Sequence, residues 1–236
     1  AGNIVIDGHC EASQIEAGGD VIIRKGCQGK GLGKIIAGKS IVGQFFESAV
    51  LTAGKDVQAT YLLNCQLKAN GKLLVEGRKG VIIGGKTCAK LGVSCNGIGN
   101  IAEIATVVSV GIDKEDMTAY QELQKKIEQT QAELQTCENG LNKLMANPVH
   151  DEKVSMMIQR LTRAVYTLKS SRKELFSERN AQMEQMTKQK EARIQVSGRA
   201  YPGTLLFLNE DPFAIKEIYN NVEFVKHDNR IDTLAH

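Results

Sequence analysis

The chain has 236 residues and a formal net charge of +3, with 30 Lys and Arg against 27 Asp and Glu. This length suits one or two domains with a sizeable core, and the absence of a basic block interleaved with aromatics argues against nucleic-acid binding. No apolar run approaches the roughly 18 residues of a membrane span and no signal peptide opens the chain, so the sequence predicts a soluble protein.

The cysteines form no CxxC pair and accompany no cluster of histidines, so we expect no metal site and no cofactor. The sequence favours free thiols that pack as small apolar residues in a reducing cytoplasm. The six positions are Cys10, Cys27, Cys65, Cys88, Cys95 and Cys137.

One short phrase recurs through residues 1–111, in the forms QIEAGGD, KIIAGKS, VLTAGKD, QLKANGK and VIIGGKT. Each copy places an apolar residue two positions before a small one, and the first interval between copies is longer than the three that follow. The apolar column is Ile15, Ile35, Leu51, Leu67 and Ile82, and the small column is Ala17, Ala37, Ala53, Ala69 and Gly84. A unit of this size cannot bury its own apolar face, so successive units stack and residues 1–111 are predicted to form a β-solenoid. Since the chain opens inside a repeat unit, we expect an upstream part to precede it.

Residues 112–194 change to a composition rich in Glu, Gln, Lys and Leu and predict two long helices. Apolar residues recur at spacings of three and four from about Asp113 to Ala146 and again from about Asp151, and Pro148 breaks the pattern between them. Two such helices joined by a short turn predict an antiparallel coiled-coil hairpin about 50 Å long. The first seam is Tyr120, Leu123, Ile127, Thr130, Leu134, Cys137, Leu141 and Leu144, and the second is Val154, Ile158, Leu161, Val165, Leu168, Arg172, Leu175, Arg179, Gln182 and Met186.

Two parts of this arm raise questions of function. The exposed tip is a candidate partner-binding surface, although a plain connector explains it as well; its residues are Asn147, Pro148, Val149 and His150. Near the other end, Arg172, Arg179 and Gln182 occupy seam positions. Either these long side chains extend past the seam, or the solenoid or a second subunit supports the helices there, and support by the solenoid is the favoured explanation.

Residues 195–236 return to β-rich runs, IQVSG, TLLFL and VEFVK. This segment is too short for a core of its own, so we expect it to complete the solenoid and to cap it against edge-to-edge pairing. The helical arm is then an insertion in the solenoid.

The phrases AGG-D-V and AGK-D-V, the segment LLVEGRKGVIIGGKT, the run TVVSVGID before the arm and the return through VSGRAYPGTLLFL resemble the flagellar assembly protein A (FapA) family. The resemblance covers essentially the whole chain and rests on the order solenoid, arm, solenoid. It implies a mainly β fold, a right-handed parallel β-helix interrupted by the coiled-coil hairpin. It also implies a bacterial cytoplasmic setting and a part in flagellum assembly or placement, and it supplies no catalytic residues.

Two segments match the phosphate-binding pattern GxxxxGK[ST], namely residues 33–40 and 80–87. Lys39 or Lys86 would neutralise phosphate charge, and Ser40 or Thr87 would bind magnesium. A true site requires a strand before the loop and a helix after it. Both matches fall at what the repeat suggests is one shared register, so the sequence favours turns of the solenoid over nucleotide sites.

Asp20, Ser40, Asp56 and Lys72 are predicted to share one column, which raises the possibility of a carbohydrate-active solenoid with stacked carboxylates. Ser40 separates the two aspartates and no second acidic column is evident, so solvated turn residues are the favoured interpretation. A hexapeptide acyltransferase would keep coils of three equal sides, and the unequal intervals of this chain do not fit that pattern.

The sequence thus predicts a non-enzymatic scaffold that acts in flagellum assembly or placement through protein contacts. We expect flagellar assembly or polar regulatory proteins as partners and a location in the cytoplasm, at the cell pole or flagellar base, and homo-oligomerisation stays open. The alternatives are a structural polymer of stacked solenoids, and a solenoid carbohydrate-active enzyme or ligand sensor.

Overall fold

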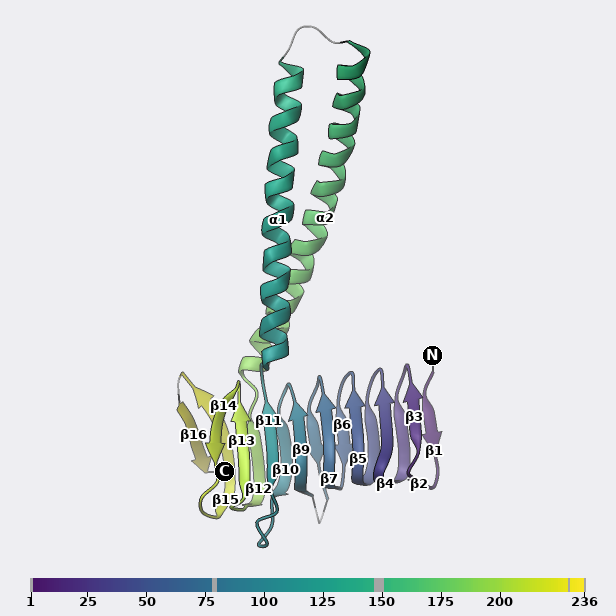
Figure 1. Ribbon diagram of the computed structural model, residues 1–236. Coiled ribbons are helices and arrows are strands. Elements are labelled where there is room, and N and C mark those ends of the chain that lie inside the picture. The colour runs from purple at the N-terminus through teal and green to yellow at the C-terminus, as the bar shows by residue number, and fades with distance from the viewer. Residues whose placement is uncertain (1, 78–79, 147–150, 229, 236) are drawn as a thin grey trace. The chain divides into compact units, whose positions relative to one another are not determined.

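The computed structural model describes residues 2–77, 80–146, 151–228 and 230–235, and Figure 1 shows it as a ribbon. The chain divides into two compact units. Residues 1–113 and 187–236 form the solenoid unit, and residues 114–186 form the helical unit. The polypeptide therefore leaves the first unit, forms the second and returns to complete the first.

The solenoid unit is one sheet of sixteen strands within the described residues, wound into about five turns. Strands of successive turns pair in parallel, which confirms the predicted β-solenoid with a helical insertion. The strands before the insertion are β1 (Ile4–Ile6), β2 (His9–Glu11), β3 (Gln14–Ala17), β4 (Val21–Ala37), β5 (Ile41–Ala53), β6 (Val57–Ala59), β7 (Tyr61–Ala69), β8 (Leu73–Val75), β9 (Val81–Ala89), β10 (Val93–Ile98) and β11 (Thr106–Val110). Those after it are β12 (Ile194–Ala200), β13 (Thr204–Leu208), β14 (Asp211–Ala214), β15 (Tyr219–His227) and β16 (Arg230–Ala235).

The predicted column of small residues is confirmed through its first four members. Strand register places each member directly on the next, and all are buried with at most 7% of their surface exposed. A small side chain is needed here because the chain turns soon after each one. The four members are Ala17, Ala37, Ala53 and Ala69.

The fifth unit departs from the prediction. Ala89 and Thr87, not Gly84 and Ile82, continue the small and apolar columns, so the last interval is as long as the first rather than the shortest of the set. The extra length lies between β8 and β9, at a corner that the preceding coil crosses with Thr60 alone. The segment VIIGGKT has the residue pattern of the repeat, but it pairs with the start of β7 and not with its end, where the repeat pattern of the earlier coils lies.

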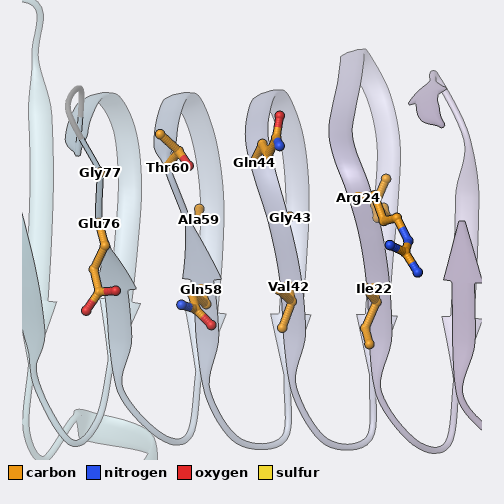
Figure 2. Close-up of a pocket in the computed structure, with 11 residues that line it drawn as sticks. Ile22, Arg24, Val42, Gly43, Gln44, Gln58, Ala59, Thr60, Glu76 and Gly77 are labelled. Carbon is orange, nitrogen blue, oxygen red and sulfur yellow. The ribbon is translucent and has the colours of Figure 1, made fainter. Parts of the chain in front are cut away.

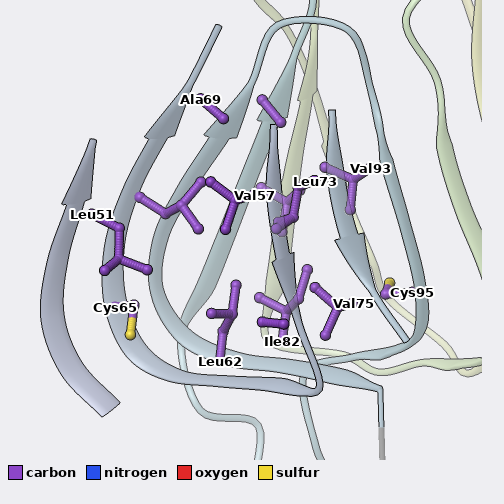
Figure 3. Packing of buried hydrophobic residues seen from close by; sticks show 14 of the residues in the cluster. Leu51, Val57, Leu62, Cys65, Ala69, Leu73, Val75, Ile82, Val93 and Cys95 are labelled. Carbon is purple, nitrogen blue, oxygen red and sulfur yellow. The ribbon is translucent and has the colours of Figure 1, made fainter. Parts of the chain in front are cut away.

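Inward-facing apolar side chains fill the solenoid, because alternate residues of each strand point to the same side. Figure 3 shows Val57, Leu73 and Val93 among the buried residues, and register stacks these three in one column. The column continues after the insertion through Ile194 and Phe224, both fully buried. Each such side chain contributes roughly 1.5–3 kcal/mol through burial. The insertion thus interrupts the sequence of the solenoid but not its core.

Strands after the insertion complete the solenoid and then reverse direction. β12 pairs in parallel with β10, and β13 pairs in parallel with β11. β14 and β15 then pair antiparallel with β13 and β12, and β16 pairs antiparallel with β15. The parallel stacking of coils therefore ends at this side of the solenoid.

Asn209 binds both chain segments that flank the insertion. Its Oδ1 accepts a hydrogen bond from the Ile112 amide at 2.9 Å, and its Nδ2 donates one to the Lys190 carbonyl at 3.2 Å. Asn209 also has a left-handed backbone, with φ of 50°, which asparagine tolerates better than most residues. One side chain thus ties the exit of the chain to its return.

The helical unit contains α1 (Lys114–Met145) and most of α2 (Glu152–Lys190), which run antiparallel (Figure 1). The Asp151 carboxylate accepts a hydrogen bond from the Val154 amide at 2.8 Å and caps α2. All predicted seam positions of both helices are buried or half-buried, and Leu134 is the most buried of them at 1% exposure. Within the described residues, neither helix is apolar enough to cross a membrane.

Cross-helix contacts set the pairing of α1 with α2. Lys169 Nζ lies 2.8 Å from Glu138 Oε1, and Arg172 Nη1 donates to Gln131 Oε1 at 2.8 Å. The guanidinium of Arg179 lies over the Phe176 ring, 4.6 Å from its centroid. The seam arginines therefore find partners within the helical unit itself, as long side chains extending past a seam do.

Candidate functional site

The first phosphate-loop match ends at a corner of the coil and not at a helix. Ser40 directly precedes the strand β5, and its amide donates to Asp20 Oδ1 at 3.0 Å. The Lys39 amide donates to the Gly19 carbonyl at 3.1 Å. These amides are engaged by neighbouring coils, so they cannot form the cradle of free amides that binds a phosphate.

The second match lies largely inside β9. Thr87 faces the core and is 1% exposed, so its hydroxyl cannot meet a solvated magnesium ion. Gly84 and Gly85 have positive φ of 69° and 76°, and a Cβ on Gly85 would lie 2.2 Å from the Cys65 carbonyl oxygen. The two glycines serve a tight corner. Because Lys86 is inside a strand, the two matches do not share a register, and that part of the sequence prediction is wrong.

The predicted polar column at another corner is present. Asp20, Ser40, Asp56 and Lys72 precede strand residues that stack in register. Asp56 Oδ1 accepts the Lys72 amide at 2.7 Å, as Asp20 accepts that of Ser40. Each carboxylate therefore satisfies a backbone amide of the next coil. The two aspartates are two coils, roughly 10 Å, apart, and they act as side-chain caps of the turns.

A groove of about 550 Å³ runs along the outer surface over four coils (Figure 2). Arg24, Gln44, Thr60 and Glu76 lie at equivalent points of successive coils, so the lining changes from a cation to a carboxylate over roughly 14 Å. Arg24 Nε also pairs with Asp7 at 2.7 Å. Glu76 is the sole carboxylate among the described lining residues, and a single carboxylate does not supply an acid and a base for glycoside hydrolysis.

An aromatic pair on the outer surface was not evident from the sequence. Phe45 and Tyr61 stack with ring centroids 6.0 Å apart and an interplanar angle of 20°. Val81 follows Tyr61 in the same column, and Gly26 precedes Phe45. The spacing of the two aromatic residues equals the repeat interval and was the available signal, but only strand register shows that they face outward together.

The geometry described above agrees with a comparison to protein families. The family model for the Flagellar Assembly Protein A (FapA) beta solenoid domain matches residues 1–231. The chain belongs to the FapA family. No curated protein and no solved structure matches the chain significantly. The resemblance found in the sequence is thereby confirmed, and FapA is not a known enzyme family.

The tip residues that the sequence singled out lie outside the described residues of this FapA-family chain. They are Asn147, Pro148, Val149 and His150. Their role as a partner-binding surface remains a prediction, and the flanking helix ends are described. Exposed methionines lie on both of these ends: Met145 on α1, and Met156 and Met157 on α2, each more than half exposed.

The thiols of this FapA-family solenoid are free, and four of the six are buried: Cys10, Cys27, Cys65 and Cys95. Burial raises the pKa of the Cys27 thiol to about 11 and that of the Cys95 thiol to about 12. A thiol with a raised pKa is a poor nucleophile and a poor metal ligand at neutral pH. Among the described residues, no three His, Cys, Asp or Glu side chains gather as metal ligands would.

Proposed function

We propose that this protein is a non-enzymatic scaffold that contributes to flagellum assembly or placement through protein–protein contacts. The observation that carries the proposal is the family match over residues 1–231, which spans both units of the chain. The residues with the strongest resemblance to catalytic motifs support a scaffold, because they hold turns: the carboxylates of Asp20 and Asp56 accept hydrogen bonds from the backbone amides of Ser40 and Lys72.

The mechanism follows from the kind of surface that the two units offer. The solenoid presents stacked strands with a shallow groove, and the arm presents two long helices. Such surfaces bind through extended complementary area rather than through a deep pocket. Flagellar assembly proteins or polar regulatory proteins are the proposed partners, and the cytoplasmic side of the cell pole or the flagellar base is the proposed location.

A head-to-tail polymer of solenoids is less favoured. β14, β15 and β16 run antiparallel to their neighbours, so the last coil does not offer the parallel register on which another first coil would stack. Natural proteins use such reversals to protect sheet edges from further pairing.

The arm can be tested by replacing residues 114–186 with a short Gly-Ser linker in the source bacterium. We expect cells with this variant to lose normally placed flagella, and the purified variant to lose partners that the full chain recovers. Normal flagella together with recovery of every partner would contradict a recognition role for the arm. Circular dichroism of the purified variant verifies that the solenoid retains its β-structure.

A matched pair of variants tests the absence of catalysis. Asp20→Asn and Asp56→Asn keep an oxygen acceptor for the turn amides but remove the carboxylates. The scaffold proposal expects normal flagella in both strains. Loss of flagella from cells that contain stable, normally abundant protein would favour an enzyme instead.

A further inference from the structure

After its first residue, Glu152, α2 has a long stretch without a carboxylate. From Lys153 to Lys173 the sequence KVSMMIQRLTRAVYTLKSSRK contains no Asp or Glu. Its six cationic residues are Lys153, Arg160, Arg163, Lys169, Arg172 and Lys173. Although the arm as a whole carries charges of both signs, residues 153–173 of α2 carry only positive charge.

Part of this charge lies on one line along the outer side of α2, away from the seam. Its members are spaced by three, four or seven residues, which places them near one another on a helix surface. All six are exposed, and the apolar members Met156 and Tyr166 are 51% and 78% exposed. We name this set the α2 stripe; it consists of Lys153, Met156, Arg160, Arg163, Tyr166 and Lys173.

The cations of the stripe differ from the other two cations of the segment in their partners. Lys169 pairs with Glu138 and Arg172 donates to Gln131, so both are engaged within the helical unit. Across the part of the chain that the structure describes, none of the four stripe cations pairs with a carboxylate. The stripe is therefore a line of positive charge about 30 Å long, without ion pairs among the described residues and bordered by Glu152 and Glu174 at its two ends.

We propose that the α2 stripe binds an acidic amphipathic helix of a protein partner. The partner's carboxylates would face Arg160, Arg163 and the two lysines, and its apolar residues would cover Met156 and Tyr166. Methionine adapts to varied apolar surfaces, and exposed tyrosine is enriched at the energetic centres of interfaces. This inference rests on the proposed scaffold function and names the chemistry of one of its partners.

Two other anionic partners fit the stripe less well. An interfacial membrane helix buries a broad apolar face, whereas the apolar face of α2 is turned toward α1. For duplex DNA, the four cations of the stripe would neutralise about four phosphates at most, fewer than the roughly 6–10 phosphate contacts of a strongly salt-dependent site. A single partner helix packs along one helical stripe with the geometry of a coiled coil.

The test measures binding of a fluorescent helical peptide to the full chain by anisotropy. The peptide has three heptads, with Leu in its apolar stripe and Glu beside it, and is about 30 Å long. We expect saturable binding that weakens as salt rises, and a loss of about tenfold or more in affinity for Arg160→Glu/Arg163→Glu. Tyr166→Ala should also weaken binding. The matched control Lys125→Glu/Lys126→Glu, two exposed lysines of α1, should change affinity less than about twofold.

Several outcomes would overturn the proposal. These are equal binding of a peptide with Gln in place of Glu, equal losses in the α1 control, or binding of anionic vesicles or duplex DNA but not of the peptide. Self-association of the chain that Arg160→Glu/Arg163→Glu abolishes would assign the stripe to a second copy and also contradict it. If the peptide fails to bind while arm-deleted cells still lose flagella, the stripe assignment fails and the scaffold function stands.

Discussion

Replacement of Asn209 tests how the solenoid tolerates an insertion. In Asn209→Ala the Ile112 amide and the Lys190 carbonyl lose their side-chain partners, which lie at 2.9 and 3.2 Å. Each such hydrogen bond contributes about 1 kcal/mol, and alanine in a left-handed backbone adds about 1 kcal/mol more. We expect a loss of about 3 kcal/mol in the free energy of unfolding, measured from the urea midpoint.

Two further substitutions at this position separate the contributions. Asn209→Gly loses both hydrogen bonds but adopts φ of 50° freely, so it should cost about 1 kcal/mol less than alanine. Asn209→Asp keeps the acceptor for the Ile112 amide and loses the donor to Lys190, so its loss should also be smaller than that of alanine.

The matched control is Asn142→Ala, at an exposed position of α1, which should change stability by less than about 0.5 kcal/mol. Limited proteolysis between residues 187 and 193 provides a second readout, since a released return segment is cleaved faster. If Asn209→Ala has wild-type stability, or if Ala and Gly are equal, the reasoning about these bonds and this backbone is wrong.

Three other predictions concern the solenoid. A Cβ on Gly43 would lie 2.6 Å from Phe46 Cζ, so Gly43→Ala should cost about 2 kcal/mol in urea unfolding, and Phe46→Leu in the same chain should recover part of it; additive losses would refute the clash. Asp56→Ala should cost about 1 kcal/mol through the Lys72 amide and Asp56→Asn less, and equal losses would show that the amide contact is unimportant. The pKa of Cys27 is about 11 in the folded chain and about 9 for an ordinary thiol, so the unfolded chain loses this proton first. The urea midpoint should therefore decrease as the pH rises from about 9 to about 11, and it should decrease less steeply with pH in Cys27→Ala. The same pH dependence in both proteins would contradict the assignment.

The sequence was sufficient to predict the solenoid and the helices because each has a strong period. The repeat units are too short to enclose a core, so they must stack on one another. Apolar residues at spacings of three and four predict helices. The predicted first helix, residues 113–146, differs from α1 by one residue at each end. Pro148 predicts where the first helix must end, because proline disfavours a continuing helix. Asp151, which caps α2, acts in the same local way on the start of the second helix.

The register of the fifth coil could not be predicted from the repeat, because two overlapping alignments are possible: one places Gly84 on Ala69, and the other places Ala89 there. VIIGGKT has the right pattern of apolar, small and turn residues, but Val81 pairs with Tyr61, at the start of β7. Strand pairing over the whole coil decides between such alternatives. The groove and the Phe45–Tyr61 pair lie in the regular coils, and there the sequence lacked only the strand register that shows which side chains face outward together.

The α2 stripe was missed for a different reason. Charges counted over both helices are mixed in sign, and this supports a solvated face with intrahelical pairs. The stripe emerges only when α2 is separated from α1 and when Lys169 and Arg172 are set aside as engaged. Charge per helix face is therefore a better guide to partners than charge per domain.

The position of the insertion suggests how such proteins vary. Val110 stacks on Ala89, and Ile194 stacks on Val93, so the entire arm occupies a corner that earlier coils cross with three residues, such as Gly54 to Asp56. At that corner a coil can grow without moving any core side chain, because both strands beside it remain in register. Relatives with arms of other lengths, or with none, should share one solenoid cross-section, and this corner is the natural place to graft a new binding module.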